Sequence, residues 1–449
     1  MPGRSTHHCS LFSGGQGLNT PLKTLYPRQS SHVDKLIDAL DQFGSALDSS
    51  ETGTGKTVCG AEIAKRANSQ TLVVCPKAVI PAWQKELSER GVTADVINYE
   101  KLRVGKSKFG KWQDKRWVWT LPPSLIIFDE AHKCSGVSTK NAKMLIEAKD
   151  RHAVLLLSAT IASNPMQMRA AGWLLGAHML GNFYQWAIKH GCVKNRWNGV
   201  EFAGDHTHIE AVAQQISHRC ARMTAAELAD HFTETQIITE PLQFGDEVAE
   251  IYDEMERELQ ALEERAEQDK TDSGAEALVK QLRARQRVEL YKVPVIVGMV
   301  QDLLAEGKSV AVFVNFQATL DALCEKLNAS AHIDGKQSAT ERQQHIDNFQ
   351  NDAERVIVCN VAAGGVGISL HDTHGNFPRA AIISPDWNEK NILQVVGRVH
   401  RAGGKTPSLQ RILFAAGTVE ERVETSVRKK ISLLKTLNEK SACAPAQSA

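Results

Sequence analysis

The segment SSETGTGKTVCGAEIAKR, residues 49–66, determines how the rest of the chain is interpreted. Two glycines stand just before a lysine, a threonine and a run with a helical pattern. Consecutive backbone N–H groups that lead into a helix N-terminus bind phosphate, and glycine lets this backbone approach a ligand without a Cβ clash. We therefore predict a nucleotide-binding loop that contains Gly53, Thr54, Gly55, Lys56 and Thr57.

Within this loop, Lys56 would reach the outer phosphates of ATP, and the Thr57 hydroxyl would bind Mg2+. Ser50 occupies the position five residues before Gly55, where the usual pattern has glycine. Its side chain is small enough for the tight backbone. By itself the segment could also be a glycine-rich turn, so the interpretation needs a second motif elsewhere in the chain.

The second motif is LIIFDEAH, residues 125–132, in which two acids follow an apolar strand. A carboxylate at the end of such a strand can hold the hydration shell of Mg2+, and another can orient the attacking water. Asp129 is the predicted metal ligand, and Glu130 is predicted to be the general base or to position the attacking water. The separation from Lys56 along the chain suits neighbouring strands of one sheet.

Short β-branched and leucine-rich runs alternate with helical patterns in two parts of the chain. This rhythm predicts an α/β fold with two parallel sheets, each flanked by helices and buried on both faces. The runs of the first part begin at Thr71, Ala94, Ser124 and Ala153, and those of the second begin at Ser309, Ala331, Arg355, Arg379 and Leu409.

A mostly helical region separates these two parts. Residues 246–269 are acidic with an apolar stripe at helical spacing, and the segment after Lys270 carries Lys280, Arg283, Arg285, Arg287 and Lys292. Two interpretations fit. The helices could pair antiparallel through their opposite charges, or the basic helix could contact nucleic acid.

Composition places the chain among soluble globular proteins. Its 449 residues are enough for two or three domains, 42% are hydrophobic and 23% are charged, and no apolar run is long enough to span a membrane. The nine cysteines include no CxxC pair, which favours reduced thiols over a zinc or iron–sulfur module. The first twenty residues lack the apolar centre of a secretory signal, so we expect a cytoplasmic protein, in the host cytoplasm if the source is viral.

Several further segments carry a resemblance to a known family. LYPRQ from Leu25, VVCPKAVIPAWQKEL from Val73 and INYEKL from Ile97 resemble motifs Q, Ia and Ib of superfamily 2 helicase-type ATPases, and LLLSAT from Leu155 resembles motif III. CNVAAGGVGISL from Cys359 and SPDWNEKNILQVVGRVHRAGGKTP from Ser384 resemble motifs V and VI. Within this superfamily the chain is similar to the Swi/Snf branch of DNA translocases, in a compact form that suits a bacterial or viral source.

The resemblance implies two RecA-like lobes and assigns roles to residues outside the two motifs above. Gln29 would read the adenine, Gln394 would contact the nucleotide or its surroundings, and Arg398 and Arg401 would be arginine fingers. Guanidinium groups from a second lobe would stabilise the transferring phosphoryl group only when the lobes close. That arrangement would couple ATP hydrolysis to lobe motion.

The strand pattern and the resemblance together predict the domain organisation. We expect a disordered tail (1–20), an ATP-binding lobe (21–236) with a helical insertion at about 162–234, a helical linker or protrusion (237–296), a second lobe (297–437) that ends in a docked helix, and a disordered tail (438–449).

The resemblance also implies that nucleic acid lies across both lobes, where backbone amides, hydroxyls and lysines can hold phosphates without reading sequence. The predicted contacts are Lys77, Tyr99, Lys101, Gly364 and Gly365. A separate segment, residues 101–123, mixes cations, among them Lys108 and Lys111, with phenylalanine and tryptophan. It could stack on bases, or it could be a β-hairpin whose tryptophans cap the core of the first lobe.

These observations predict an ATP hydrolase that nucleic acid stimulates and that uses ATP and Mg2+ to move along duplex or branched DNA, for remodelling, branch migration or protein displacement. Two alternatives remain open: a strand-separating DNA or RNA helicase, and a non-catalytic clamp on nucleic acid. The formal net charge of +1 neither supports nor excludes a nucleic-acid partner, because a local groove can be basic on a neutral protein.

Overall fold

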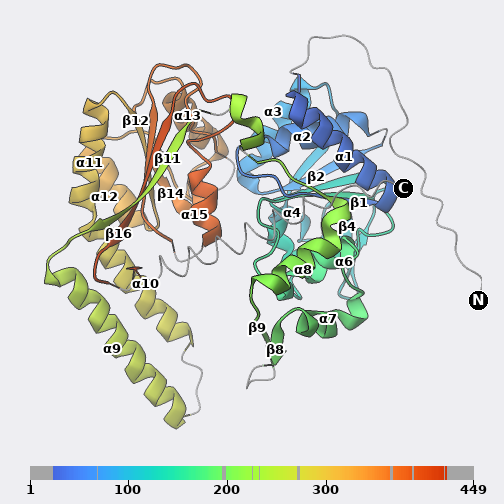
Figure 1. Ribbon diagram of the computed structural model, residues 1–449, viewed down its shortest axis with the longest axis horizontal. Coiled ribbons are helices and arrows are strands. Elements are labelled where there is room, and N and C mark those ends of the chain that lie inside the picture. Colours follow the sequence, from blue (N-terminus) through green and yellow to red (C-terminus); the bar gives the residue numbers. More distant parts are fainter. Residues whose placement is uncertain are drawn as a thin grey trace, which may run out of the picture. The chain divides into compact units, whose positions relative to one another are not determined.

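The computed structural model describes residues 24–67, 69–194, 199–224, 226–231, 233–269, 274–364, 368–386, 389–418 and 420–421. The chain divides between Leu228 and Ala229 into two compact units, each an α/β lobe (Figure 1). The division falls before residue 236, the predicted end of the first lobe, because the strand that begins at Thr235 belongs to the second sheet. Both predicted tails and the predicted docked helix beyond Glu421 lie outside the described residues.

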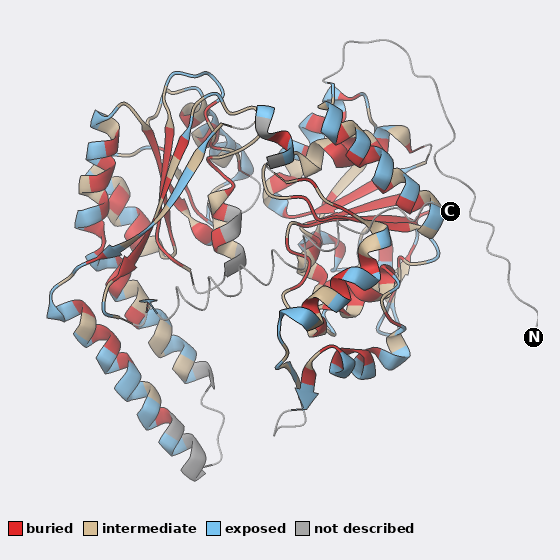
Figure 2. Ribbon diagram, viewed as in Figure 1, coloured by how far each residue is buried: buried red, intermediate tan, exposed pale blue. Residues whose placement is uncertain are grey.

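The sheet of the first lobe has six parallel strands in the order β10-β1-β7-β6-β2-β3. Their bounds are β1 Ser45–Asp48, β2 Thr71–Cys75, β3 Asp95–Asn98, β6 Leu125–Asp129, β7 Ala153–Leu157 and β10 Cys220–Ala221. Every residue of β2, β6 and β7 is buried (Figure 2). Strands covered on both faces need continuous apolar runs, and these three segments supply them.

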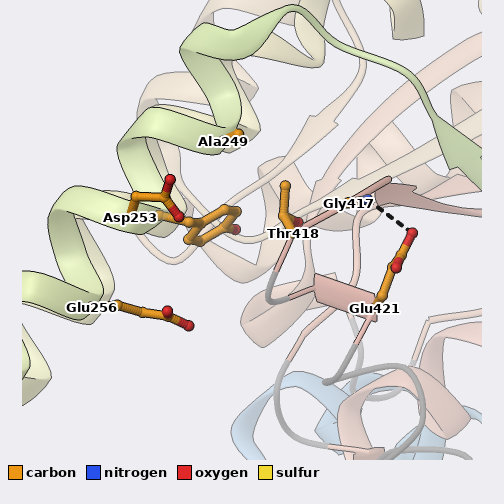
Figure 3. Close-up of a pocket in the computed structure, with 7 residues that line it drawn as sticks. Ala249, Asp253, Glu256, Gly417, Thr418 and Glu421 are labelled. Carbon is orange, nitrogen blue, oxygen red and sulfur yellow. Dashed lines mark hydrogen bonds between the residues drawn. The ribbon is translucent and has the colours of Figure 1, made fainter.

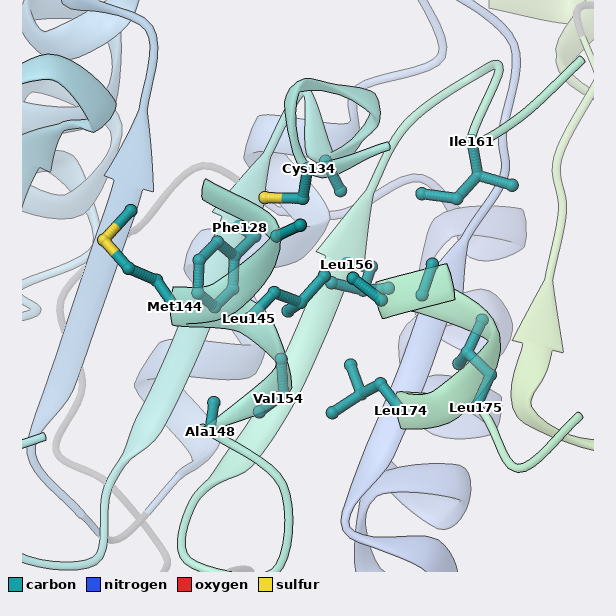
Figure 4. Packing of buried hydrophobic residues seen from close by; sticks show 14 of the residues in the cluster. Phe128, Cys134, Met144, Leu145, Ala148, Val154, Leu156, Ile161, Leu174 and Leu175 are labelled. Atoms are coloured by element: carbon teal, nitrogen blue, oxygen red, sulfur yellow. The ribbon is translucent and has the colours of Figure 1, made fainter. Parts of the chain in front are cut away.

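Helices on either side cover this sheet. Those before β7 are α1 Pro27–Phe43, α2 Lys56–Arg66, α3 Ile80–Glu89, α4 Tyr99–Leu102 and α5 Lys140–Ile146. Figure 4 shows the core on one face, where Phe128 and Leu156 of the sheet meet Leu145 from α5 and Leu174 from the next helix. These four side chains are almost completely buried.

The predicted insertion after β7 is only partly helical. It contains α6 Arg169–Leu174, α7 Phe183–Lys189, the antiparallel strands β8 Cys192–Lys194 and β9 Val200–Phe202, and α8 His206–Ile216. Strand β10 then returns to the sheet and pairs with β1, through Leu47 with Cys220 and Asp48 with Ala221. The insertion therefore ends beside the strand that leads into the predicted nucleotide-binding loop.

A short hairpin, β4 Gly110–Gln113 with β5 Arg116–Trp119, forms in the segment rich in tryptophan. Trp117 and Trp119 are buried in the core of the lobe. The ring of Trp117 lies only 2.3 Å from where a Cβ on Gly110 would stand, so that position must be glycine. The interpretation of a core-capping hairpin is confirmed.

The second lobe also has a six-stranded parallel sheet, in the order β11-β16-β15-β12-β14-β13. Its strands are β11 Thr235–Leu242, β12 Ser309–Val314, β13 His332–Ile333, β14 Val356–Asn360, β15 Arg379–Ile383 and β16 Ser408–Ala415. Its helices are α11 Val293–Ala305, α12 Gln317–Leu327, α13 Ala339–Gln350, α14 Val361–Gly364 and α15 Glu389–Val396. The five strand positions predicted for this part are confirmed.

Helices α9 (Asp246–Asp269) and α10 (Gly274–Tyr291) form an antiparallel pair attached to the second lobe (Figure 1). Lys280 lies 3.0 Å from Glu258 and Arg287 lies 2.9 Å from Glu254. The apolar stripe of α9 packs on Val288 and its neighbours. Pairing through opposite charges, the first of the two interpretations of this region, is therefore confirmed.

A buried ion pair joins α10 and α11 to the end of the second lobe. The Lys292 Nζ lies 2.6 Å from Glu420 Oε2, and both side chains are buried. Glu420 also accepts hydrogen bonds from the Tyr252 hydroxyl (2.9 Å) and the Ala415 N–H (2.7 Å). These contacts satisfy the lysine and the carboxylate, as a buried pair requires.

A hollow of about 240 Å3 lies between α9 and the segment that follows β16 (Figure 3). The Gly417 N–H donates to Glu421 Oε1 at 2.9 Å at its edge. Its lining is Ala249, Tyr252, Asp253, Glu256, Gly417, Thr418 and Glu421. None of the residues predicted to act on nucleotide lines it, so it is separate from that chemistry.

Candidate nucleotide site

The predicted nucleotide-binding loop lies between β1 and the N-terminus of α2. Gly53 (φ 86°) and Gly55 (φ 96°) both have left-handed backbone conformations, which glycine adopts without strain. A Cβ on Gly55 would stand 2.6 Å from the Gln29 amide nitrogen, so a side chain there would also collide with α1. The geometry explains why both positions of the motif are glycine.

Lys56 folds back over the loop that it follows. Its Nζ donates to the carbonyl oxygens of Ser50 (2.7 Å) and Glu51 (2.9 Å). The ammonium is thereby held above the backbone groups that would surround a phosphate. Thr57 is half-buried in the first turn of α2, at the positive end of the helix.

The first half of the loop is fixed by the end of the insertion. The Ser49 N–H donates to the Ala221 carbonyl (2.9 Å), and the Glu51 N–H donates to the Met223 carbonyl (3.0 Å). Arg222 Nη2 donates to Glu51 Oε1 at 2.8 Å. The first residues of the loop therefore continue the backbone pairing of β1 with β10.

A buried polar cluster supports the same loop from below. His32 Nε2 of α1 lies 3.2 Å from Asp48 Oδ1 and 3.3 Å from the Ser50 hydroxyl oxygen. The Ser50 N–H donates to Asp48 Oδ1 at 2.9 Å, and the Ser50 hydroxyl accepts from the Met223 N–H. Ser50 is thus tied to three segments of the lobe, which gives its side chain a structural role that glycine could not fill.

The charge of Asp48 depends on this cluster. Burial acts to raise the pKa of Asp48, but the neighbouring His32, the Lys56 ammonium and the hydrogen bond with Ser50 together hold that pKa below its usual value. The ionised carboxylate is therefore the form that the fold favours.

We expect a specific pH dependence of stability from Asp48. Because its pKa is lower in the folded than in the unfolded protein (about 3.9), it stabilises the fold above that pH and loses this contribution as the pH falls through the folded value. The destabilisation caused by Asp48→Asn should therefore shrink between about pH 6 and about pH 3. Urea unfolding of both proteins across this range measures it, and a constant difference would contradict the assignment.

Gln29 is buried against the nucleotide-binding loop. Its Nε2 donates to the Thr54 carbonyl at 2.9 Å, and its Oε1 accepts from the Tyr26 N–H at 3.1 Å. Both ends of the amide are thus hydrogen-bonded within the protein, and one N–H of Nε2 is left to other partners. The predicted contact with adenine stays a prediction.

Asp129 stands at the end of β6 and Glu130 directly after it. Strand β7 lies between β1 and β6, so the loop and the acids are on next-nearest strands and not on neighbouring ones, as their separation had suggested. Carboxyl ends of parallel strands still meet at one edge. The pKa of Asp129 is raised overall by its burial and by the Glu130 charge, and the Lys56 ammonium opposes this rise. The two groups therefore lie within electrostatic range of each other.

Asp129 is held by two donors. Its Oδ1 accepts from the Glu130 N–H at 2.9 Å and its Oδ2 accepts from Trp83 Nε1 at 2.8 Å. Burial and the Glu130 charge raise the pKa of Asp129 to about 6, against the opposing effects of Trp83 and Lys56. The two neighbouring carboxylates, Asp129 and Glu130, repel each other, and a cation bound beside them would reduce this repulsion.

Glu130 has a left-handed backbone conformation (φ 53°), which is uncommon for a residue with a Cβ. Its Oε2 lies 3.3 Å from His132 Nδ1, and the same nitrogen lies 3.3 Å from the Ser158 hydroxyl after β7. His132 thus connects the acidic motif to the segment SAT. Backbone strain of this kind is often found at functional sites.

The oxygen ligands in this lobe fit Mg2+. Asp129 offers a carboxylate whose Oδ1 accepts from the Glu130 N–H and whose Oδ2 accepts from Trp83, and Thr57 offers a hydroxyl. Mg2+ prefers such hard ligands, few from the protein and the rest from phosphate and water. In the described part of the chain, no group of three or more His, Cys, Asp or Glu side chains is arranged to hold a metal ion.

The predicted residues of the second lobe cluster around α15. Gln394 is part of this helix, and Arg398 and Arg401 follow it. Arg398 is buried, and its Nη1 donates to the Ile368 carbonyl at 3.2 Å. Arg401 is half-buried, and its Nε donates to the Gly397 carbonyl at 3.1 Å.

The predicted nucleic-acid contacts differ in their placement. Lys77, Lys101, Lys108 and Lys111 are exposed. Lys108 also lies 3.0 Å from Asp95. Gly364 ends α14, and Gly365 lies outside the described residues.

Tyr99 requires a correction. It is completely buried, and its hydroxyl donates to the Asp129 carbonyl at 2.9 Å. Burial raises the pKa of Tyr99 well above its usual value. It supports the end of β6 and cannot touch nucleic acid, so the predicted contact is wrong.

Four residues of this site were missed by sequence reasoning: His32, Asp48, Trp83 and His132. His132 follows the acidic pair directly in the segment DEAH, and that position could have drawn attention to it. The other three come from α1, β1 and α3, and no short motif joins them. Their roles become visible only when the segments fold together.

The fold and this site define a P-loop ATPase with two RecA-like lobes. Residues 294–403 match the family described as helicase conserved C-terminal domain. A protein of Acanthamoeba polyphaga mimivirus, whose name describes an ATP-dependent RNA helicase, is 32% identical over 96% of this chain and 86% of its own length.

Two further relatives match nearly the whole chain. A Caenorhabditis elegans homologue of SWI/SNF-related matrix-associated actin-dependent regulator of chromatin subfamily A-like protein 1 is 25% identical over 92% of this chain, which spans 62% of that relative. The uncharacterized ATP-dependent helicase YqhH of Bacillus subtilis is 22% identical over 93% of this chain and 81% of its own length.

The chain therefore belongs to the superfamily 2 helicase-type ATPases and is similar to their Swi/Snf branch. The predicted resemblance, the fold class and the ATP hydrolase activity are confirmed at this level, and nucleic acid is the substrate class that the family implies. Among the described residues, no helix is both long and apolar enough to cross a membrane.

Proposed function

We propose that this protein is a DNA translocase, which uses ATP hydrolysis to move along duplex or branched DNA without needing to separate the strands. The observation that carries the proposal is the site of the first lobe, where the Lys56 loop and the acids Asp129 and Glu130 meet at one edge of the sheet, in a chain similar to SWI/SNF-related proteins. Remodelling, branch migration and protein displacement are the activities that such movement would serve.

In the proposed mechanism Lys56 would bind the outer phosphates, and Thr57 and Asp129 would hold the metal. When bound, Mg2+ would neutralise charge on the β- and γ-phosphates. Glu130 takes a proton from the attacking water, and Arg398 and Arg401 stabilise the transferring phosphoryl group. Gln29 and Gln394 contribute to nucleotide contacts, the former at the adenine.

The hairpin β4–β5 supports contact with the DNA backbone over stacking on bases. Trp117 and Trp119 are buried, and Trp112 is held by a hydrogen bond from its Nε1 to the Arg103 carbonyl (2.8 Å). Lys140 also lies 5.6 Å from the centre of the Trp112 ring. The aromatic side chains are thus engaged within the protein, whereas Lys111 is exposed and can reach phosphates.

We expect the double variant Lys108→Ala/Lys111→Ala to weaken DNA-stimulated ATP hydrolysis while nucleotide affinity stays the same. Each lost phosphate contact should reduce the slope of log affinity against log salt by about 1. DNA binding at several salt concentrations measures this, with Lys85→Ala on the exposed side of α3 as the matched control. Unchanged DNA affinity would remove the hairpin from the interface.

The proposed substrate is tested by ATP hydrolysis with single-stranded DNA, duplex DNA, forked DNA and RNA. The proposal expects the strongest stimulation by duplex or forked DNA. The mimivirus relative favours a second candidate, an RNA helicase, because its name describes one. Stimulation by RNA alone would establish that alternative, and no hydrolysis with any partner would favour a non-catalytic clamp.

We also propose that the protein works in a reducing compartment such as the cytoplasm, or the host cytoplasm if its source is viral. The cysteines at positions 59, 75, 134, 192, 220, 324 and 359, all within the described ranges, are free. Burial raises the pKa of the Cys59 and Cys75 thiols next to the nucleotide site, which makes them unreactive.

A further inference from the structure

The Trp83 side chain of α3 reaches the end of β6. It is completely buried, and its Nε1 donates to Asp129 Oδ2 at 2.8 Å. The Glu130 N–H donates to the other oxygen, Oδ1, at 2.9 Å. One donor on each oxygen fixes the plane of the carboxylate and leaves acceptor capacity on both oxygens for a metal or its water.

The chain makes room for this contact at Gly60 in α2. A Cβ on Gly60 would stand 2.8 Å from Trp83 Cη2, so the indole passes over α2 only because that position lacks a side chain. Helix α2 also begins with the nucleotide-binding residues Lys56 and Thr57. The tryptophan therefore lies between the helix that follows the phosphate loop and the predicted metal ligand.

Helix α3, which carries Trp83, is held in place against α2. Arg90, just after α3, is buried and lies 2.7 Å from Glu62 of α2 and 3.1 Å from Glu86 of α3. This ion-pair group holds the two helices together beside Trp83. The indole is thus clamped before any ligand arrives.

We infer that Trp83 is a positioning residue for Mg2+ binding, which acts by orienting the Asp129 carboxylate. The inference rests on the proposed role of Asp129. A ligand that is hydrogen-bonded in the correct orientation needs no reorganisation when the metal binds, and loss of such a supporting contact typically costs 10–100-fold in metal affinity. A tryptophan that only filled the core would have no such effect.

The test compares full-length wild type with Trp83→Phe, which keeps an aromatic ring and removes the N–H. The affinity for a fluorescent ADP analogue is measured in EDTA and during titration with Mg2+. We expect equal affinity in EDTA and a roughly 10-fold higher Mg2+ concentration at half-saturation. Trp119→Phe is the matched control, because its Nε1 donates at 3.1 Å to the Met144 carbonyl in the core, away from Asp129.

A second replacement keeps the test valid if Trp83→Phe does not fold. Benzothienylalanine at position 83 preserves the shape of the indole and replaces the N–H by sulfur, and it should give the same shift. Equal Mg2+ titrations for wild type and this replacement would overturn the inference. The Asp129→Asn variant separates failure of this inference from failure of the proposed function. If its Mg2+ titration also equals that of wild type, Asp129 is not the metal ligand.

Discussion

Glu130→Gln should reduce the turnover number for ATP by about 10²–10⁴-fold, the usual contribution of a general base. The amide has the same shape but cannot take the proton of the attacking water. Nucleotide affinity should remain or improve, because the Glu130 charge is one of the effects that raise the pKa of Asp129 and its loss favours the ionised metal ligand.

The measurement is steady-state ATP hydrolysis at saturating DNA, together with the affinity for a fluorescent nucleotide. Glu100→Gln, an exposed acid on α4 of the same lobe, is the matched control and should keep full activity. A turnover number for Glu130→Gln equal to that of wild type would assign the base elsewhere. Absence of hydrolysis in the wild type itself would favour the clamp.

Lys292→Met should destabilise the second lobe by about 3–5 kcal/mol, the usual cost of removing one partner of a buried ion pair. The variant leaves Glu420 charged and buried beside Tyr252. For a lobe of this size, each kcal/mol corresponds to roughly 2–4 °C in melting temperature. Thermal and urea unfolding measure the effect.

The double variant Lys292→Met/Glu420→Gln should recover most of this loss, because the neutral amide removes the buried charge. Its oxygen can accept from the Ala415 N–H, and its NH2 group can donate to the Tyr252 hydroxyl oxygen. Lys280→Met is the control: its partner Glu258 is about half exposed, so the loss should stay within about 1 kcal/mol. If the double variant is as unstable as Lys292→Met, the loss of stability comes from the missing contacts of Lys292 and not from the unpaired Glu420 carboxylate.

The sheets of both lobes follow from sequence because their central strands are continuous apolar runs such as Leu125–Asp129. Strand β1, with the sequence SALD, is too short and too polar at its end to be recognised. Its position is fixed by pairing with β7 and β10, which are distant in sequence. Tertiary pairing, which local pattern does not contain, decides such elements.

The candidate site shows the same limit. The glycines and Lys56 lie in one segment with a fixed backbone requirement, so their spacing, together with the acidic motif at residues 125–132, predicts the site. The sequence places Tyr99 directly after a strand, which suits both a core residue and a surface contact with nucleic acid. Only the hydrogen bond from its hydroxyl to the Asp129 carbonyl identifies it as a core residue. The partnership of Trp83 with Asp129 likewise joins residues from two motifs, and neither motif reveals the other's position.

The pairing of the phosphate loop with Ala221–Met223 has a mechanical consequence. Those three residues are among the last of the first lobe, and the chain reaches β11 of the second sheet at Thr235. Any nucleotide-driven shift of Ser49 or Glu51 would therefore be passed through backbone hydrogen bonds to Ala221–Met223, at the end of the insertion.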